Sequence, residues 1–176
     1  INKGIQQFPT DVRFLIFKAQ LEFQDGKKGR EAALSTIKFA IPLVGENLKH
    51  QWYVAKLLLD AGDQTEAVKL VDSLRNKFGK TPVIEYLQSR ILKNDGKPGE
   101  AVSILERIKD GLSNEPKLAI ESDFFLASLY QQLGNPERQL AAYERIIRQD
   151  ASIPEAQLGK ADCLAALGKN KEAEAI

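Results

Sequence analysis

The sequence has few of the residues on which metal sites, disulfide frameworks and catalytic centres depend. Its 176 residues include one cysteine, one histidine, one tryptophan and no methionine. A single cysteine, Cys163, excludes an internal disulfide framework and does not indicate a compartment. No set of His, Cys, Asp and Glu residues has the spacing of a metal site. We therefore expect neither a metal nor a cofactor.

The chain also lacks a long apolar run and a strong excess of one charge. No stretch approaches the ~18 residues that a membrane helix needs, and no signal segment opens the chain. We expect no membrane insertion by these residues and leave the compartment, cytoplasm or periplasm, open. The net charge of +1 argues against a nucleic-acid partner, which normally requires a basic face. With 43% hydrophobic and 28% charged residues, the composition is that of a soluble folded domain.

Two candidate catalytic motifs fail on inspection. His50 and Cys163 lie 113 residues apart, so a Cys–His dyad would require distant helices to meet. Cys163 is better explained as a small buried apolar residue. The Gly-Lys-Thr segment at 79–81 ends like a phosphate-binding loop, but Leu74 stands where that loop needs glycine. We predict a non-catalytic protein without a small-molecule substrate.

The sequence does contain a repeated glycine. The repeat consists of Gly26, Gly62, Gly96, Gly134 and Gly168, which are separated by 36, 34, 38 and 34 residues. A Glu-Ala pair stands shortly after most of these glycines. Such a period indicates one helix–turn–helix unit copied along the chain. The last four glycines are each expected to end a helix, because glycine adopts positive φ at low cost.

Alternating A and B helices are therefore predicted. The A helices cover residues 11–25, 48–61, 82–95, 117–133 and 154–167. The B helices cover residues 29–41, 64–78, 98–110, 136–149 and 170–176. Pro98, Pro136 and Pro154 lie near helix starts, where a missing N–H has no cost. Four extra residues within 109–116 predict a longer loop or an extra turn on the fourth A helix.

This pattern resembles the tetratricopeptide repeat over nearly the whole chain. Repeats begun at Val12, Leu48, Pro82, Ile120 and Pro154 place Ala19, Ala55, Ser89, Ala127 and Ala161 at the family's small position 8. Small side chains there let the two helices of a hairpin approach closely. The family's large position 11 is occupied by Leu58, Leu92, Tyr130 and Leu164, whereas the first repeat has Glu22. We expect Glu22 to reflect either a slipped register or a face left open by a missing preceding repeat.

The resemblance implies an all-α fold, an alpha–alpha superhelix in which about five helix–turn–helix repeats form a right-handed solenoid. We predict a single domain over residues 1–176. Its repeats cover residues 12–47, 48–81, 82–119, 120–153 and a truncated 154–176, and residues 1–11 end a preceding repeat. The missing start methionine and the short last helix indicate a fragment of a longer array. Exposed apolar edges are expected to favour end-to-end association.

The family's groove positions map onto a predicted partner-binding surface. This surface comprises Arg13, Ile16, Gln20, Lys49, Trp52, Lys56, Tyr86, Arg90, Lys93, Glu121, Phe124, Ser128, Leu158 and Asp162. Residues 1–95 carry 15 basic and 11 acidic side chains, and residues 96–176 carry 10 and 13. A bound peptide is therefore expected to place its acidic end over the first repeats. The alternative is that the aromatic members only pack between neighbouring A helices.

The resemblance implies a non-catalytic protein–protein interaction scaffold that binds a peptide or partner subunit in its concave groove. The carboxylate clamp of some family members is not present, because Ile16 and Gln20 stand where its first Lys and Asn would be. Two alternatives stay open. One is a structural section of a bacterial secretion, exopolysaccharide-export or envelope-assembly protein. The other is the substrate-recruiting region of a larger enzyme such as a glycosyltransferase.

Overall fold

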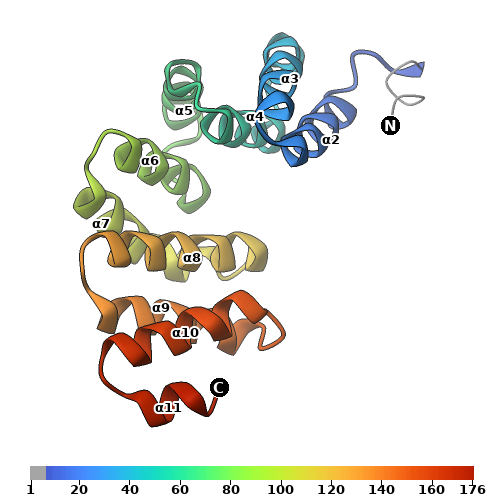
Figure 1. The fold of residues 1–176 in the computed structure, drawn as a ribbon. Coiled ribbons are helices and arrows are strands. Elements are labelled where there is room, and N and C mark those ends of the chain that lie inside the picture. Colours follow the sequence, from blue (N-terminus) through green and yellow to red (C-terminus); the bar gives the residue numbers. More distant parts are fainter. Residues whose placement is uncertain (1–6) are drawn as a thin grey trace. The chain divides into compact units, whose positions relative to one another are not determined.

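The computed structural model describes residues 7–176, and every regular element in this range is helical (Figure 1). The all-α prediction is therefore confirmed. The predicted end of a preceding repeat at residues 1–11 lies largely outside the described residues. The chain divides within its third predicted A helix into two compact units, Ile1–Leu87 and Gln88–Ile176, which are described separately. The single domain over the whole chain stays a prediction.

The N-terminal unit consists of two helical hairpins and the first part of a further helix. Its elements are α2 (Val12–Glu22), the 3-10 turn η1 (Phe23–Asp25), α3 (Gly26–Ala40), the 3-10 turn η2 (Ile41–Leu43), α4 (Leu48–Ala61), α5 (Gln64–Phe78) and the start of α6 (Pro82–Asn94). Helix α2 packs against α3, α4 packs against α5, and α3 also contacts α4. The turn η1 joins α2 to α3 without the loop that the sequence predicted.

The C-terminal unit contains the end of α6 and the remaining helices. These are α7 (Pro98–Ile108), the 3-10 turn η3 (Lys109–Leu112), α8 (Pro116–Gln132), α9 (Pro136–Gln149), α10 (Pro154–Ala166) and α11 (Asn170–Glu174). Helix α7 packs against α8, α8 against α9, α9 against α10, and α10 against α11. From α7 onward each helix therefore contacts the next one along the chain, as expected of stacked hairpins.

Glycines and polar caps set the helix ends at the predicted places. Gly62 ends α4 with a φ of 87°, and the next amide, of Asp63, donates to the Leu58 carbonyl at 2.9 Å. The other glycines predicted to end A helices, at positions 96, 134 and 168, also have positive φ. Asn47 and Asp63 accept hydrogen bonds from amides in the first turns of α4 and α5. The bounds of α4, α5 and α9 agree with the prediction, and α3 begins three residues earlier.

The small residues predicted at position 8 lie inside the hairpins. Ala19, Ala55, Ser89 and Ala127 are fully buried, and Ala161 is half-buried. Leu58, Tyr130 and Leu164, predicted as large partners at position 11, are buried as well.

The exceptional Glu22 is half-buried and has partners. Its carboxylate accepts a hydrogen bond from the Thr36 hydroxyl at 2.8 Å and pairs with Lys18 at 3.3 Å. Thr36 lies on α3, so the carboxylate joins the two helices of its hairpin. These two contacts stabilise Glu22 at a position where an unpaired carboxylate would be costly.

Candidate functional site

The apolar part of the predicted partner surface in the N-terminal unit is mostly packed. Tyr86 is only 2% exposed, and Ile16 is also buried. The Trp52 indole N–H donates to the Val83 carbonyl of α6 at 2.7 Å, and its ring lies 5.2 Å from Tyr53 and 6.3 Å from Tyr86. The predicted partner surface is therefore corrected for Ile16 and Tyr86, because adjacent helices cover them. Trp52 is half-buried and presents only part of its ring.

Two basic members in the N-terminal unit, Arg13 and Lys56, have acidic neighbours. The Arg13 guanidinium donates to both carboxylate oxygens of Asp11, at 2.6 to 3.2 Å. These hydrogen bonds, with one from the Arg13 amide, lower the pKa of Asp11 to about 2. Lys56 lies 3.3 Å from Asp60. Lys49 and Gln20 are exposed. Much of the predicted positive charge on these A helices is thus balanced within one or two turns.

The predicted residues of the C-terminal unit include an exposed apolar surface. The Phe124 ring meets Tyr143 edge to face, with centroids 6.2 Å apart. The Tyr143 ring in turn lies against Gly159, with ring atoms 2.5 and 2.6 Å from the place of a Cβ there. Leu158, the residue before Gly159, is 66% exposed. Tyr143 of α9 therefore lies between Phe124 of α8 and Gly159 of α10.

Polar members of the prediction lie on the same two helices as Phe124 and Leu158. Glu121 lies one turn before Phe124 on α8, and Asp162 lies one turn after Leu158 on α10. Ser128 is exposed and donates to the Phe125 carbonyl at 2.9 Å. We use the name Leu158 surface for Glu121, Phe124, Tyr143, Leu158 and Asp162.

Two further predicted residues lie on the last turns of α6. Arg90 is half-buried and Lys93 is exposed. Both belong to the C-terminal unit by the division of the chain, whereas Tyr86 of the same helix belongs to the N-terminal unit. Their participation in one surface with the other residues stays a prediction.

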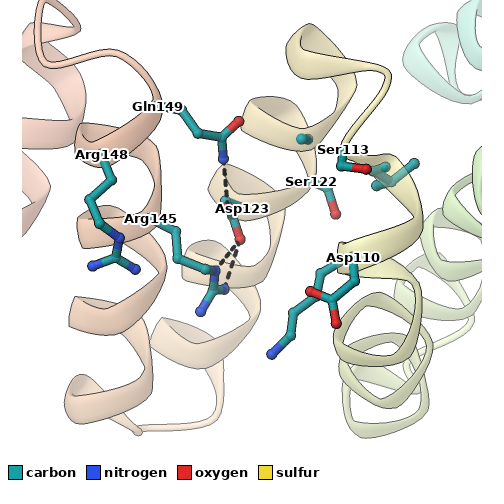
Figure 2. Close-up of a pocket in the computed structure, with 10 residues that line it drawn as sticks. Asp110, Ser113, Ser122, Asp123, Arg145, Arg148 and Gln149 are labelled. Carbon is teal, nitrogen blue, oxygen red and sulfur yellow. Dashed lines mark hydrogen bonds and ion pairs between the residues drawn. The ribbon is translucent and has the colours of Figure 1, made fainter.

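A cleft of about 460 Å³, which the sequence did not predict, opens between η3, α8 and the end of α9 (Figure 2). Most of its lining is polar or charged. The lining residues are Lys109, Asp110, Leu112, Ser113, Ala119, Ser122, Asp123, Arg145, Arg148 and Gln149. The cleft forms where the chain carries its extra residues between the third and fourth repeats. In the sequence, only the insertion within 109–116 pointed to this site. The polar lining residues follow no helical period, so they could not be recognised as one surface.

The cleft lies on the opposite side of α8 from the Leu158 surface. Each residue of an α-helix advances by about 100° around the helix axis. The mean direction of Ala119, Ser122 and Asp123 is therefore about 180° from that of Glu121, Phe124 and Ser128. The insertion forms η3 and also extends the start of α8 to Pro116. Both outcomes that the sequence predicted for these residues, a longer connection and an extra turn, are therefore present.

A buried ion pair forms one wall of the cleft. Asp123 is 5% exposed, and its Oδ1 accepts from Arg145 Nε at 2.8 Å and lies 2.7 Å from Arg145 Nη2. Gln149 Nε2 lies 3.5 Å from the other carboxylate oxygen. Burial raises the pKa of Asp123, and the hydrogen bond from Arg145 offsets only part of that increase. The pair holds the Arg145 guanidinium beside the open space.

Other polar groups face the same space. In Figure 2, Arg145 extends from α9 and Ser122 from α8 toward the opening that Asp110 borders. The Ser122 hydroxyl is buried and has no hydrogen-bond partner among residues 7–176. Lys109 pairs with Glu106 at 2.9 Å. For Arg148, by contrast, no ion pair forms with another residue in the described range.

The two residues considered for catalysis lie in different units. Cys163 is buried on α10, and burial raises the pKa of its thiol, which keeps it protonated. His50 is half-buried on α4, in the N-terminal unit. Across the described part of the chain, no three His, Cys, Asp or Glu side chains lie close enough to hold a metal ion. None of the helices in that part has both the length and the apolar character needed to cross a membrane.

In the comparison with known sequences, one family model matches part of the chain. The tetratricopeptide repeat model matches residues 126–176, from the middle of α8 to the end of the chain. No curated protein matches the sequence at a significant level.

Comparison with solved structures extends the fold likeness over most of the chain. A thermophilic tetratricopeptide-repeat protein of Thermus thermophilus aligns with a TM-score of 0.67 and 16% identity, over 93% of this chain and 87% of that one. PilF of Pseudomonas aeruginosa has the same TM-score with 14% identity, over 93% and 72%. A chain of the Cut9–Hcn1 hetero-tetramer of the APC/C gives 0.70 and 14%, over 94% and 32%. At these identities the likeness concerns the fold.

Proposed function

Because this chain is a small tetratricopeptide-like helical array, we propose that it is a protein–protein interaction module that binds its partner through the Leu158 surface. The observation that carries the proposal is Leu158 itself. It is 66% exposed and directly precedes Gly159, against which the Tyr143 ring lies, within the part of the chain that the family model matches. Binding energy concentrates on a few large side chains of an interface, among which aromatic residues such as Tyr143 are enriched.

The chemistry of the surface selects a class of partner. Glu121 and Asp162 stand one turn from Phe124 and Leu158, so an apolar contact is flanked by negative charge. A partner segment with one large apolar side chain and basic residues on both sides of it would complement this arrangement. The excess of acidic side chains in residues 96–176 also favours a positively charged partner.

The fold supports a role in protein–protein interaction. The two alternatives from the sequence, an envelope-assembly section and a region of a larger enzyme, gain no separate support. One structurally similar protein is described as part of a protein complex, the Cut9–Hcn1 hetero-tetramer of the APC/C. Among the described residues, none favours the envelope-assembly or glycosyltransferase alternative over a general partner-binding role. We therefore retain non-catalytic partner binding as the proposed function.

The test compares two exposed leucines of the C-terminal unit. A partner is captured from extract of the source cells, identified by mass spectrometry and purified. Its affinity is then measured by calorimetry against the wild type, Leu158→Asp and Leu133→Asp. Leu133 is 46% exposed at the end of α8 and lies outside the Leu158 surface.

We expect Leu158→Asp to weaken binding about 30-fold, which is the size of a hot-spot loss. Leu133→Asp should leave the affinity within about twofold of wild type, because isolated surface changes away from a contact have small effects. Equal affinity of all three proteins would refute the proposed surface.

A further inference from the structure

We infer that the cleft between η3, α8 and α9 is a second binding site, and that it takes an oxyanion carried by a polypeptide partner, a carboxylate or a phosphate. The site is distinct from the Leu158 surface, which lies on the other side of α8. The inference therefore goes beyond the proposed function and does not depend on it.

The first reason is a buried hydroxyl that lacks a partner. Ser122 is 2% exposed and its Oγ forms no hydrogen bond within residues 7–176, although it lines the cleft. A buried polar atom without a partner destabilises a fold. A ligand oxygen in the cleft would supply the missing hydrogen bond.

The second reason is the balance of donors and acceptors. Asp123 already accepts from Arg145 and lies beside the Gln149 amide. Arg145 keeps N–H groups that this single carboxylate cannot use, because a guanidinium has five. Arg148 adds a guanidinium without an ion-pair partner among the described residues, and the Ser113 and Ser122 hydroxyls can both donate. The cleft therefore has more donors to offer than acceptors, which favours a ligand made of acceptors.

The third reason is that Arg145 is held in place before any ligand arrives. Its contacts of 2.7 and 2.8 Å with a buried carboxylate fix the guanidinium, and α9 and α8 hold both partners. A fixed guanidinium loses little side-chain entropy on binding, so more of its interaction energy appears as affinity. Arginine in this setting is well suited to carboxylate and phosphate.

The acidic groups at the cleft allow a test in which variants change the affinity for an oxyanion in opposite directions. Asp123 is balanced by Arg145, and Glu106 is balanced by Lys109. Asp110, also in the lining, forms no such ion pair within residues 7–176 and would repel an oxyanion. Removing the charge of Asp110 should therefore strengthen oxyanion binding, whereas removing the charge of Arg148 should weaken it.

Three small probes distinguish the ligand chemistries. They are blocked phosphoserine, blocked glutamate and blocked glutamine, each N-acetylated and amidated, titrated into the full chain at constant ionic strength. Binding is followed by NMR on the backbone amides of Ser113, Ser122 and Gln149 and on the Arg145 Nε–H. We expect saturable shifts with at least one charged probe and none with glutamine. The charged probe that binds more tightly identifies the oxyanion as phosphate or carboxylate.

Four variants complete the test. Ser122→Ala should weaken binding about tenfold, the value of a hydrogen bond to a charged group, and Arg148→Gln about fivefold, the value of an exposed ion pair. Asp110→Asn should strengthen binding about threefold. Arg30→Gln removes an exposed arginine of α3, in the other unit, and should change nothing.

Several results would overturn the inference. The first is the absence of saturable shifts with both charged probes, and the second is equal binding of the glutamine probe. The third is that Ser122→Ala lowers the melting temperature without any probe, because the hydroxyl would then serve the fold. Arg148 and Asp110 are both exposed, so their variants test the charge preference of the cleft with little effect on folding.

Discussion

Two aspartates of this chain, one in each unit, have different environments. In the N-terminal unit, Asp63 lies at the start of α5, where Lys38 donates to it at 2.9 Å and the Glu66 amide at 3.2 Å. These hydrogen bonds lower the pKa of Asp63. In the C-terminal unit, Asp123 lies inside the array, and burial raises its pKa despite Arg145. The first aspartate caps a helix, whereas the second fixes an arginine at the edge of a cleft.

The two environments have opposite effects on the stability of the charged carboxylate. A capping aspartate stabilises the folded state, since its charged form is favoured there. A buried aspartate is costly, because the desolvation of both charges opposes their attraction. Local arrangements of this kind are enriched at functional sites. The cleft beside Asp123 is therefore a place in which we expect binding.

The largest expected effect is on the close packing of the first hairpin. A Cβ on Gly29 would overlap the backbone carbonyl oxygen of Glu22 and lie 2.8 Å from Asp25 Cβ. A backbone atom cannot move aside cheaply, so Gly29→Ala should lower the free energy of unfolding by about 3 kcal/mol or more. Urea unfolding followed by Trp52 fluorescence reports on this unit, because Trp52 is the only tryptophan.

Gly159→Ala is the matched change in the C-terminal unit. There the added methyl would meet the Tyr143 ring, which is a side chain and can rotate away. We expect a loss of about 1 kcal/mol, and Tyr143→Leu should recover much of it by making room. Equal losses at Gly29 and Gly159 in urea unfolding followed by circular dichroism would contradict the distinction between a backbone and a side-chain contact.

The next effect compares the two aspartate pairs. Asp123→Ala leaves Arg145 beside buried groups without its carboxylate, and we expect a loss of about 2 kcal/mol, since the guanidinium is 23% exposed and keeps some hydration. Lys38→Ala removes only the exposed partner of Asp63 and should cost at most about 1 kcal/mol. Urea unfolding by circular dichroism measures both. A larger loss for Lys38→Ala would reverse the comparison.

The sequence predicted the regular parts of the fold well because they rest on local signals. The glycine at the end of α4 and the capping Asp63 fix the bounds of α4 and α5 by backbone geometry alone. The buried alanines of the hairpins follow from close helix approach. The start of α3 was predicted late, because the turn η1 allows the chain to enter α3 directly at Gly26.

The candidate sites were less predictable, because they depend on contacts between helices. The family positions placed Leu158 and Phe124 on the predicted surface, but they gave no indication that neighbouring helices bury Ile16 and Tyr86. The cleft combines residues 22 to 26 positions apart, Asp123 with Arg145 and Gln149. Only the packing of α8 against α9 brings them together, and the insertion before α8 opens the space beside them.

A smaller effect should follow from removing one hydrogen bond of the N-terminal unit. Trp52→Phe keeps an aromatic ring against Tyr53 and Tyr86 but deletes the N–H that donates to the Val83 carbonyl. We expect a loss of about 1 kcal/mol, the usual value of such a bond. Circular dichroism in urea measures it, since the fluorescent group is gone. An unchanged midpoint would mean that solvent satisfies the carbonyl equally well.

The smallest expected effect is a difference in the pH dependence of the two units. The pKa of Asp63 is lowered in the folded state, so its contribution to stability is present above the ordinary aspartate value of 3.8 and is lost as the pH falls through the folded value. The pKa of Asp123 is raised, so its cost is present at neutral pH and is relieved as the pH falls through its folded value toward 3.8. Asp63→Asn should therefore make stability less sensitive to acid, and Asp123→Asn more sensitive.

Two measurements check this contrast. Carboxyl-carbon NMR titration of the wild type measures both pKa values, and urea unfolding between neutral and acidic pH measures how the free energy of unfolding of each variant changes with pH. If the two aspartates titrate on the same side of 3.8, the contrast between a capping and a buried carboxylate is wrong.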